Sequence, residues 1–527
     1  MRQPGGPVAF SLVLALVSAS AVHAQGRGGP NWTTTSSDAQ RTAWVKTDPR
    51  ISKESFQKPG FQLLWKNKLE NQPRQLESLT QPMLLSNIIA YKGFKALAFG
   101  GGSSDNVYSI DYDLNKIFWK RHLNAMPAGA GTIACPGAMT TITRATPLGQ
   151  TTPSAGRGGP APVPPPGGGG GGGGRGGNTN VYAISSGGLL HTLNPQTGDD
   201  MTPPVKLLPP NAKAVGAVLI DTTMYVATRD GCGTAANGVY AMDLGSDAKT
   251  TTHWESKGGS VAGSAGITFG TDGNIYVATD GGGPGSNDAN AIVALDPKTL
   301  AARDWFSPGS TPFTTSPVAF NYKGKDLIVA ANADGRLYVL DAGSLGGADH
   351  RTPLSKTAPY SAGAGEFAAG ALATSENADG SRWVFAAAAG PPGAGTAIGS
   401  SNGQVTNGAI VAYKLVDQNG TPGLQTVWTS RDLSSPAPPT VVNGVVFAIS
   451  TGEYRSGDAQ LTAAQRAQRG KAAVLYALDA ASGKELWSSG TTISSFVRGV
   501  GPSAGDGQVY VVTYDGTVYA FGIPLEH

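Results

Sequence analysis

The feature that most constrains the fold is a strand–turn–strand unit near the end of the sequence, AVLYALDAASGKELWSSG, at residues 473–490. Val474–Leu478 and Leu486–Trp487 are rich in β-branched, aliphatic and aromatic residues, which favours two short strands. A turn is expected between them, because Asp479 can bond to its own backbone and Gly483 can adopt a positive φ. A single hairpin cannot bury its own apolar faces, so this unit must be one part of a repeated structure.

The same apolar strand, most often ending in Asp, recurs eight times, and we interpret each copy as the third strand of a four-stranded unit. The copies are Val107–Asp111, Leu190–Asn194, Val239–Asp243, Ile292–Asp296, Leu337–Asp341, Ile410–Lys414, Leu475–Asp479 and Val518–Gly522. In five units an outer strand with a tryptophan follows: Trp119, Trp254, Trp305, Trp428 and Trp487. The last unit lacks an outer strand, and the isolated strand Phe61–Leu69 supplies it. The sequence therefore predicts an all-β fold, an eight-bladed β-propeller closed by an N-terminal outer strand that completes the last blade.

Composition agrees with this architecture. The 527 residues include 75 Gly and 36 Pro, and only 14% of them are charged, which suits many short strands joined by turns. One toroidal fold can absorb this length as a single unit. The formal net charge of +3 is small for the length and argues against nucleic acid as a partner.

Residues 1–24 have the pattern of a signal peptide. A basic start is followed by an apolar run over Val8–Ala21 and by a cleavage site of small residues that ends at Ala24. The run is too short to span a membrane, and no other run reaches that length. We therefore expect an exported chain without a membrane span, cleaved after Ala24 and either periplasmic or secreted.

Three further segments are distinguished by composition. Residues 25–60 form a lead-in before the propeller at 61–527, and within it Ser36–Val45 predicts a short helix. Residues 145–178 are rich in Pro and contain a run of eight glycines, which predicts a disordered insertion. Thr462–Arg469 predicts a short helix with Thr462 as its N-cap.

The chain has two cysteines, Cys135 and Cys232. The first precedes the second blade, and the second follows the second strand of the third blade. Loops between strands four and one share a propeller face with loops between strands two and three, so both cysteines lie on that face in adjacent blades. In an oxidising compartment we expect a disulfide between them; the alternative is two buried free thiols.

The repeat resembles a known family. YALD followed by GKELW, with DGRLYVLD and DGTVYAF elsewhere, is similar to the pyrroloquinoline-quinone (PQQ) repeat of the quinoprotein alcohol dehydrogenase-like eight-bladed β-propellers. The resemblance covers residues 61–527 and implies that fold. Because the family includes both quinoprotein dehydrogenases and non-enzymatic assembly scaffolds, the resemblance alone implies no activity.

For a dehydrogenase the resemblance implies a Ca²⁺ ion held by Glu, Asn and Asp oxygens, an Asp as general base and a basic side chain beside the quinone. Three matching segments depart from that pattern. Gly281 stands where the metal-binding Asn is expected, Phe313–Val318 contains no Asp, and Ala333 takes the place of the basic residue. The chain also lacks adjacent cysteines and a Cys-x-x-Cys-His haem motif. These departures favour a protein without PQQ and without a metal site.

Four other polar residues lie on the predicted face that carries the cysteines: Arg229, Asp280, Glu453 and Arg498. They are our candidates for ligand binding near the axis, although charged residues at loop edges are commonly only solvated. The histidines show no metal-ligand spacing, and no Ser-His-Asp grouping or phosphate-binding glycine motif is present. The catalytic residues, if any, are unknown from sequence.

These observations favour an exported propeller that acts as a binding or assembly scaffold, with an unknown protein or small-molecule ligand at the propeller face. The alternative is a divergent PQQ-dependent alcohol or sugar dehydrogenase that uses PQQ with Ca²⁺. A propeller hydrolase or lyase with a site outside the family pattern is a third interpretation.

Overall fold

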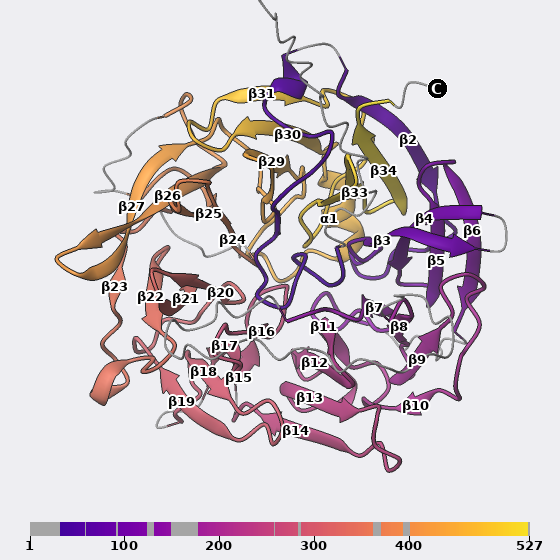
Figure 1. Cartoon of the computed structure of the whole chain (residues 1–527), viewed down its shortest axis with the longest axis horizontal. Coiled ribbons are helices and arrows are strands. Elements are labelled where there is room, and N and C mark those ends of the chain that lie inside the picture. The colour runs from indigo at the N-terminus through magenta and orange to yellow at the C-terminus, as the bar shows by residue number, and fades with distance from the viewer. Residues whose placement is uncertain are drawn as a thin grey trace, which may run out of the picture.

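The structure is a computed structural model that describes residues 32–57, 60–90, 93–123, 131–148, 178–257, 259–282, 286–361, 370–393 and 401–524. Eight antiparallel sheets stand around one axis as the blades of a ring (Figure 1). This arrangement confirms the predicted eight-bladed β-propeller. The signal peptide and residues 149–177 of the Pro/Gly-rich insertion lie outside the described residues. Ala145, at the start of that insertion, forms a parallel bridge with Leu219.

In each blade the strands follow one another from the axis outward. Blade 1 holds β3 (Met83–Ala90), β4 (Gly93–Gly101), β5 (Asn106–Asp111) and β6 (Lys116–His122). Blade 2 holds β7 (Thr141–Arg144), β8 (Val181–Ile184), β9 (Leu189–Leu193) and β10 (Val205–Lys206). Blade 3 holds β11 (Lys213–Ile220), β12 (Thr223–Arg229), β13 (Gly238–Asp243) and β14 (Thr251–Glu255). In blade 4, β15 (Gly259–Val261) and β16 (Thr268–Phe269) both pair with β17 (Ile275–Gly281), followed by β18 (Ile292–Leu295) and β19 (Ala302–Phe306).

The second half of the ring repeats this order. Blade 5 holds β20 (Val318–Tyr322), β21 (Lys325–Ala331), β22 (Leu337–Asp341) and β23 (Ser355–Lys356). Blade 6 holds β24 (Ala373–Glu376), β25 (Arg382–Ala389), β26 (Gly408–Gln418) and β27 (Thr421–Thr429). Blade 7 holds β28 (Thr440–Val442), β29 (Val445–Ser450), β30 (Val474–Asp479) and β31 (Glu485–Ser488). Blade 8 holds β32 (Ser503–Gly505), β33 (Gln508–Val512), β34 (Thr517–Gly522) and, as its outer strand, β2 (Gln62–Lys68).

Strand β2 closes the ring as predicted. It pairs antiparallel with β34, with Lys66 opposite Tyr519 and Lys68 opposite Thr517. The indole of Trp65 also donates to the Tyr112 carbonyl of blade 1, 3.0 Å away. An element from the start of the chain therefore joins the last blade to the first.

The outer tryptophans hold neighbouring blades together. Trp428 of blade 6 donates to the Ala480 carbonyl in the turn of blade 7, 2.9 Å away, and its ring lies against Gly483. A Cβ on Gly483 would stand 2.3 Å from that ring, and the residue has a φ of +70°. Glycine is thus required in the GKELW turn for its conformation and for contact with the preceding blade.

The short helix α1 (Ala463–Arg469) begins and ends where the sequence predicts. The Thr462 side chain accepts a hydrogen bond from the Gln465 backbone N–H, and the Gln465 side chain accepts one from the Thr462 backbone N–H, forming a capping box. Three 3₁₀ turns complete the regular structure: η1 (Glu54–Phe56), η2 (Cys232–Thr234) and η3 (Gly347–Asp349).

The predicted helix at Ser36–Val45 is wrong. The segment instead follows an irregular path in which Ser36, Ser37, Arg41 and Ala43 have positive φ, and it ends in β1 (Trp44–Val45), which pairs parallel with β28. In Figure 1 the indigo trace of this segment crosses the middle of the ring. The helix does not form because inner strands of the blades use the backbone groups that a helix would pair internally.

Candidate functional site

The candidate site is an open cavity on the axis, which we call the funnel. Its volume is about 880 Å³, and residues from all eight blades line it. Thr35 of the lead-in, Gln81 and Ser264 also border the small space at the hub, so they form the base of the funnel. A cavity of this size on a symmetry axis is a common location for ligand binding.

All four sequence candidates, Arg229, Asp280, Glu453 and Arg498, line the funnel. The structure divides them between two walls. Arg229 and Asp280 belong to blades 3 and 4, whereas Glu453 and Arg498 belong to the connections around blades 7 and 8, on the opposite side of the ring. Arg498 lies before β32 rather than within the inner strand, where we expected it.

The wall at blades 7 and 8 is built on Glu453, whose side chain is only 2% exposed. Its Oε1 accepts from Arg498 Nη1 at 2.5 Å, and its Oε2 accepts from Arg455 Nε at 2.8 Å. Arg498 Nε also lies 3.5 Å from Glu77 Oε1. Burial works against the charged guanidinium of Arg498, but Glu77 and Glu453 outweigh it and raise its pKa. Both carboxylate oxygens of Glu453 are therefore committed to arginines.

The wall at blades 3 and 4 is less complete. Asp230 is held by Lys213 at 2.8 Å and by Arg229 at 3.3 Å; burial raises its pKa, but the two cations outweigh that and lower it. Asp280 accepts a hydrogen bond from the Ser260 backbone N–H at 3.0 Å, while its Oδ2 lies 3.9 Å from Arg229 Nη2. That separation is too long for a hydrogen bond. Burial raises the pKa of Asp280 to about 6, and Arg229 opposes this only in part.

The predicted disulfide is confirmed. Cys135 and Cys232 are bonded with their Cα atoms 5.4 Å apart, and Cys232 lines the funnel. Beside it, Lys213 Nζ donates to the Ala134 carbonyl at 2.7 Å. The bond therefore joins the connection that enters blade 2 to blade 3 at the funnel wall.

The segments that match the dehydrogenases also reach the funnel. Asp280, Phe313 and Ala333 line it, and Gly281 follows Asp280 in β17. The donors present do not fit a Ca²⁺–quinone site, because Gly281 and Ala333 carry no ligating or basic group and Glu453 is bound by two arginines. Among the described residues, no three His, Cys, Asp or Glu side chains are grouped so that they could hold a metal ion.

Sequence reasoning missed Lys213, Asp230, Arg455 and Glu77. Asp230 and Arg455 stand within two residues of candidates, so a charged neighbour in the same loop was an available signal. Lys213 and Glu77 come from other loops, and their approach depends on the closed ring.

Comparison with known proteins supports the fold. Residues 425–523 match the family model described as outer membrane protein assembly factor BamB. Over 94% of this chain, it superposes on the quinohemoprotein alcohol dehydrogenase of Comamonas testosteroni, with 15% identity, a TM-score of 0.54 and 82% of that chain covered. It also superposes on a europium-containing methanol dehydrogenase over the same share, with 11% identity, a TM-score of 0.57 and 98% of that chain covered.

The chain shares the eight-bladed propeller fold of these proteins. Its repeats are of the PQQ type, as the matching model and the two superpositions show. A search of curated proteins gives no match. Within the described part of the chain, no helix has the length and apolar character needed to cross a membrane.

Proposed function

We propose that this protein is an exported binding or assembly scaffold whose ligand docks in the funnel. The observation that carries the proposal is the state of the charged groups in the funnel wall. Glu453 is bound by Arg455 and Arg498, and Asp230 by Lys213 and Arg229. Such pairs shape and polarise a surface, but a group that transfers protons must be available to its substrate.

The match of residues 425–523 to an assembly-factor model agrees with a scaffold. The cavity volume of about 880 Å³ suits a compact small molecule or a loop of a partner protein. Export remains a proposal that rests on the signal-peptide pattern and on the Cys135–Cys232 disulfide, a bond that persists in oxidising compartments.

The alternative function is a divergent PQQ-dependent dehydrogenase. The observation in its favour is positional: Asp280, Phe313 and Ala333 come from the segments that resemble the dehydrogenase site, and all three line the funnel. The side chains at these positions argue against it.

A cofactor-loading experiment separates the two. The purified chain is incubated with PQQ and Ca²⁺, desalted, and assayed for bound quinone by absorbance and for dye reduction with alcohols and sugars. We expect neither stoichiometric uptake nor turnover. Uptake of one quinone per chain together with dye reduction would overturn the scaffold proposal.

Site-specific photo-crosslinking tests the funnel as the docking surface. A photoreactive side chain is placed at Met139, which lines the funnel, and in a matched variant at Ile117, an apolar side chain 48% exposed on the outer strand β6. In cells that export the protein, we expect a defined adduct from position 139 and none from position 117. Adducts from position 117 alone would place docking on the outer rim and contradict the proposal.

A further inference from the structure

The irregular segment at residues 32–50, which we call the hub segment, contacts every blade of the ring. Its carbonyl oxygens accept hydrogen bonds from backbone N–H groups of inner strands, at 2.7 to 3.1 Å. The donors, in ring order, are Leu84 to Trp32 in blade 1, Arg144 to Thr33 in blade 2, Phe269 to Ala39 in blade 4, Ala319 to Gln40 in blade 5, Thr374 to Thr42 in blade 6 and Val441 to Ala43 in blade 7. In blade 3 the Thr34 hydroxyl donates to the Ala217 carbonyl, and in blade 8 the Gly507 N–H donates to Asp48. The segment thus winds once around the axis in the order of the blades.

The ring is complete without this segment. All four strands of every blade fall within residues 62–522, and β2 closes blade 8 after the hub segment has left the axis. The segment adds one two-residue strand, β1, beside β28. It therefore occupies the centre of a finished ring and is not one of the ring's building units.

Arg41 is the most deeply held side chain of the segment, at 1% exposure. Its guanidinium donates to the Gly216 carbonyl of blade 3 and the Ile267 carbonyl of blade 4, each at 2.7 Å. It also donates to the Thr34 hydroxyl and the Thr35 carbonyl, each at 2.8 Å. Burial lowers the pKa of Arg41 to about 10, so the side chain stays charged at neutral pH. Two blades and the segment itself form a pocket that fits one arginine.

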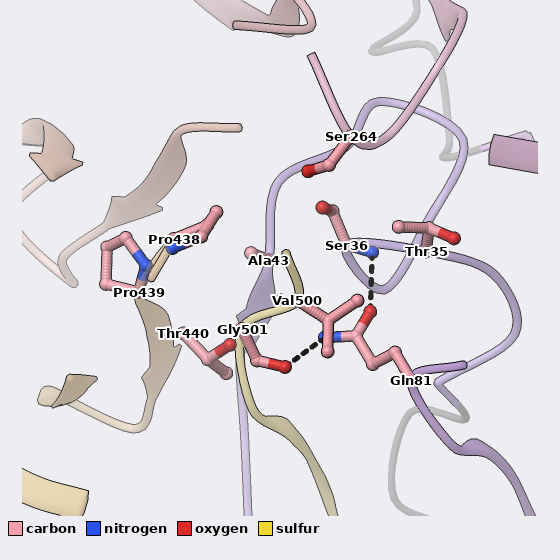
Figure 2. A pocket seen from close by; sticks show the side chains of 10 residues that line it. All are labelled: Thr35, Ser36, Ala43, Gln81, Ser264, Pro438, Pro439, Thr440, Val500 and Gly501. Carbon is pink, nitrogen blue, oxygen red and sulfur yellow. Dashed lines mark hydrogen bonds between the residues drawn. The ribbon is translucent and has the colours of Figure 1, made fainter. Parts of the chain in front are cut away.

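Gln81 ties the segment to the closing blade, as Figure 2 shows. Its Oε1 accepts from the Ser36 backbone N–H at 3.2 Å, while its Nε2 donates to the Gly501 and Pro502 carbonyls. The space left between Ser36, Ser264 and the prolines of blade 7 is only about 10 Å³. Packing at the hub is nearly complete.

We propose that the hub is a polypeptide-binding site, filled in cis by residues 32–50, in which the Arg41 pocket fixes the register of the bound segment. One main-chain hydrogen bond per inner strand together with a side-chain pocket is the way sheets recognise extended peptides. Since inner-strand N–H groups need partners when buried, a ring without the segment would present a row of open donors to another polypeptide. The segment also supplies Thr35 to the base of the funnel, so release of the segment would open the funnel toward the opposite face.

The test uses the full chain with a protease site inserted in the connection between η1 and β2. The folded protein is cleaved there, so the hub segment is held only by its contacts, and its retention is followed by size-exclusion chromatography. A fluorescent synthetic peptide of residues 32–57 is then added in excess under rising urea. The matched peptides carry Arg41→Met or Lys46→Met; Lys46 is a cation of the same segment but is exposed.

We expect the cleaved segment to stay bound and to be replaced by the wild-type and Lys46→Met peptides while the circular dichroism of the ring is unchanged. The Arg41→Met peptide should compete about 100-fold less well, because it leaves buried acceptors unpaired. Loss of the segment on cleavage from a ring that stays folded would overturn the proposal. So would equal competition by Arg41→Met, or exchange only when the ring itself unfolds. None of these outcomes depends on the funnel ligand.

Discussion

The hub and the funnel share one axis, yet they satisfy their arginines in different ways. At the hub, Arg41 gives its N–H groups to three backbone carbonyls and one hydroxyl. In the funnel, Arg498 and Arg455 share the carboxylate of Glu453. Backbone acceptors are fixed by the strands that carry them, whereas side-chain partners can turn toward a ligand. The difference suits the hub to holding one segment in one register, and the funnel to adapting to what enters it.

Replacement of Arg41 should produce the largest effect, because the hub offers no alternative partner. Arg41→Met leaves buried carbonyls of blades 3 and 4 without donors, and we expect a loss of about 3–5 kcal/mol in the free energy of unfolding. Urea unfolding followed by circular dichroism measures it. Lys46→Met removes a positive charge from the same segment at an exposed position and should change stability by less than about 0.5 kcal/mol. Equal losses in both variants would show that charge, and not the pocket, matters.

The funnel wall at Glu453 should respond almost as strongly. Glu453→Gln keeps the shape but leaves Arg498, whose side chain is 22% exposed, with a single distant carboxylate. We expect a loss of about 3 kcal/mol in urea unfolding.

The matched control for Glu453 is Glu485→Gln. It breaks the Arg431–Glu485 pair, whose side chains are 45% and 37% exposed, and should cost less than about 1 kcal/mol. If the two variants are equally stable, Glu453 is not a structural ion pair, and the wall is free to rearrange around a ligand.

The disulfide should contribute less than either arginine cluster, since it constrains one wall only. The double variant Cys135→Ser and Cys232→Ser removes a crosslink between residues 97 apart. The chain-entropy model allows up to roughly 4–5 kcal/mol, and measured values commonly fall lower, so we expect about 2–3 kcal/mol. Urea unfolding of the wild type with and without reductant is the control. A stability difference that persists under reductant would assign the effect to the serines and not to the bond.

The fold could be predicted because its signals are local. Each third strand and its turn recur in the sequence, and Thr462 caps α1 from three residues away. The disulfide followed from the same repeat, since the propeller places both loops on one face. Even so, the requirement for Gly483 was understood only in part, because its contact with Trp428 belongs to the preceding blade.

The path of the hub segment could not be predicted, because its partners are far away in sequence. Ser36–Val45 has the start of a helix, but Arg41 binds Gly216 and Ile267, 175 and 226 residues away. The funnel shows the same limit. Candidates chosen by loop position reached it, whereas Lys213, which holds Asp230 from another strand, carries no local sign of that role.

The smallest effect is expected at Asp280, the carboxylate of the funnel that lacks a close cation. Its pKa rises from 3.8 to about 6 on folding, first because of burial, so the folded state binds the proton more tightly than the unfolded chain between these values. Wild-type stability should therefore be favoured at low pH and fall as pH rises through about 6. Asp280→Asn removes this penalty. Since the side chain is 32% exposed and solvent screens it, we expect the variant to be more stable than wild type by about 1 kcal/mol at pH 7.5 and equal to it near pH 3.5.

Asp296 provides the control of opposite sign. Backbone N–H groups of Thr299 and Lys298 lower the pKa of Asp296 to about 2, so its contribution to stability is present above the unfolded value near 3.8 and is lost as pH falls through about 2. Asp296→Asn should therefore be less stable than wild type at pH 7.5, with the gap closing at low pH, whereas the Asp280→Asn difference has the reverse sign. Urea midpoints of the three proteins at each pH measure both. If Asp280→Asn is instead destabilised at neutral pH, Arg229 must already pair with the Asp280 carboxylate, and the two walls of the funnel are equally committed.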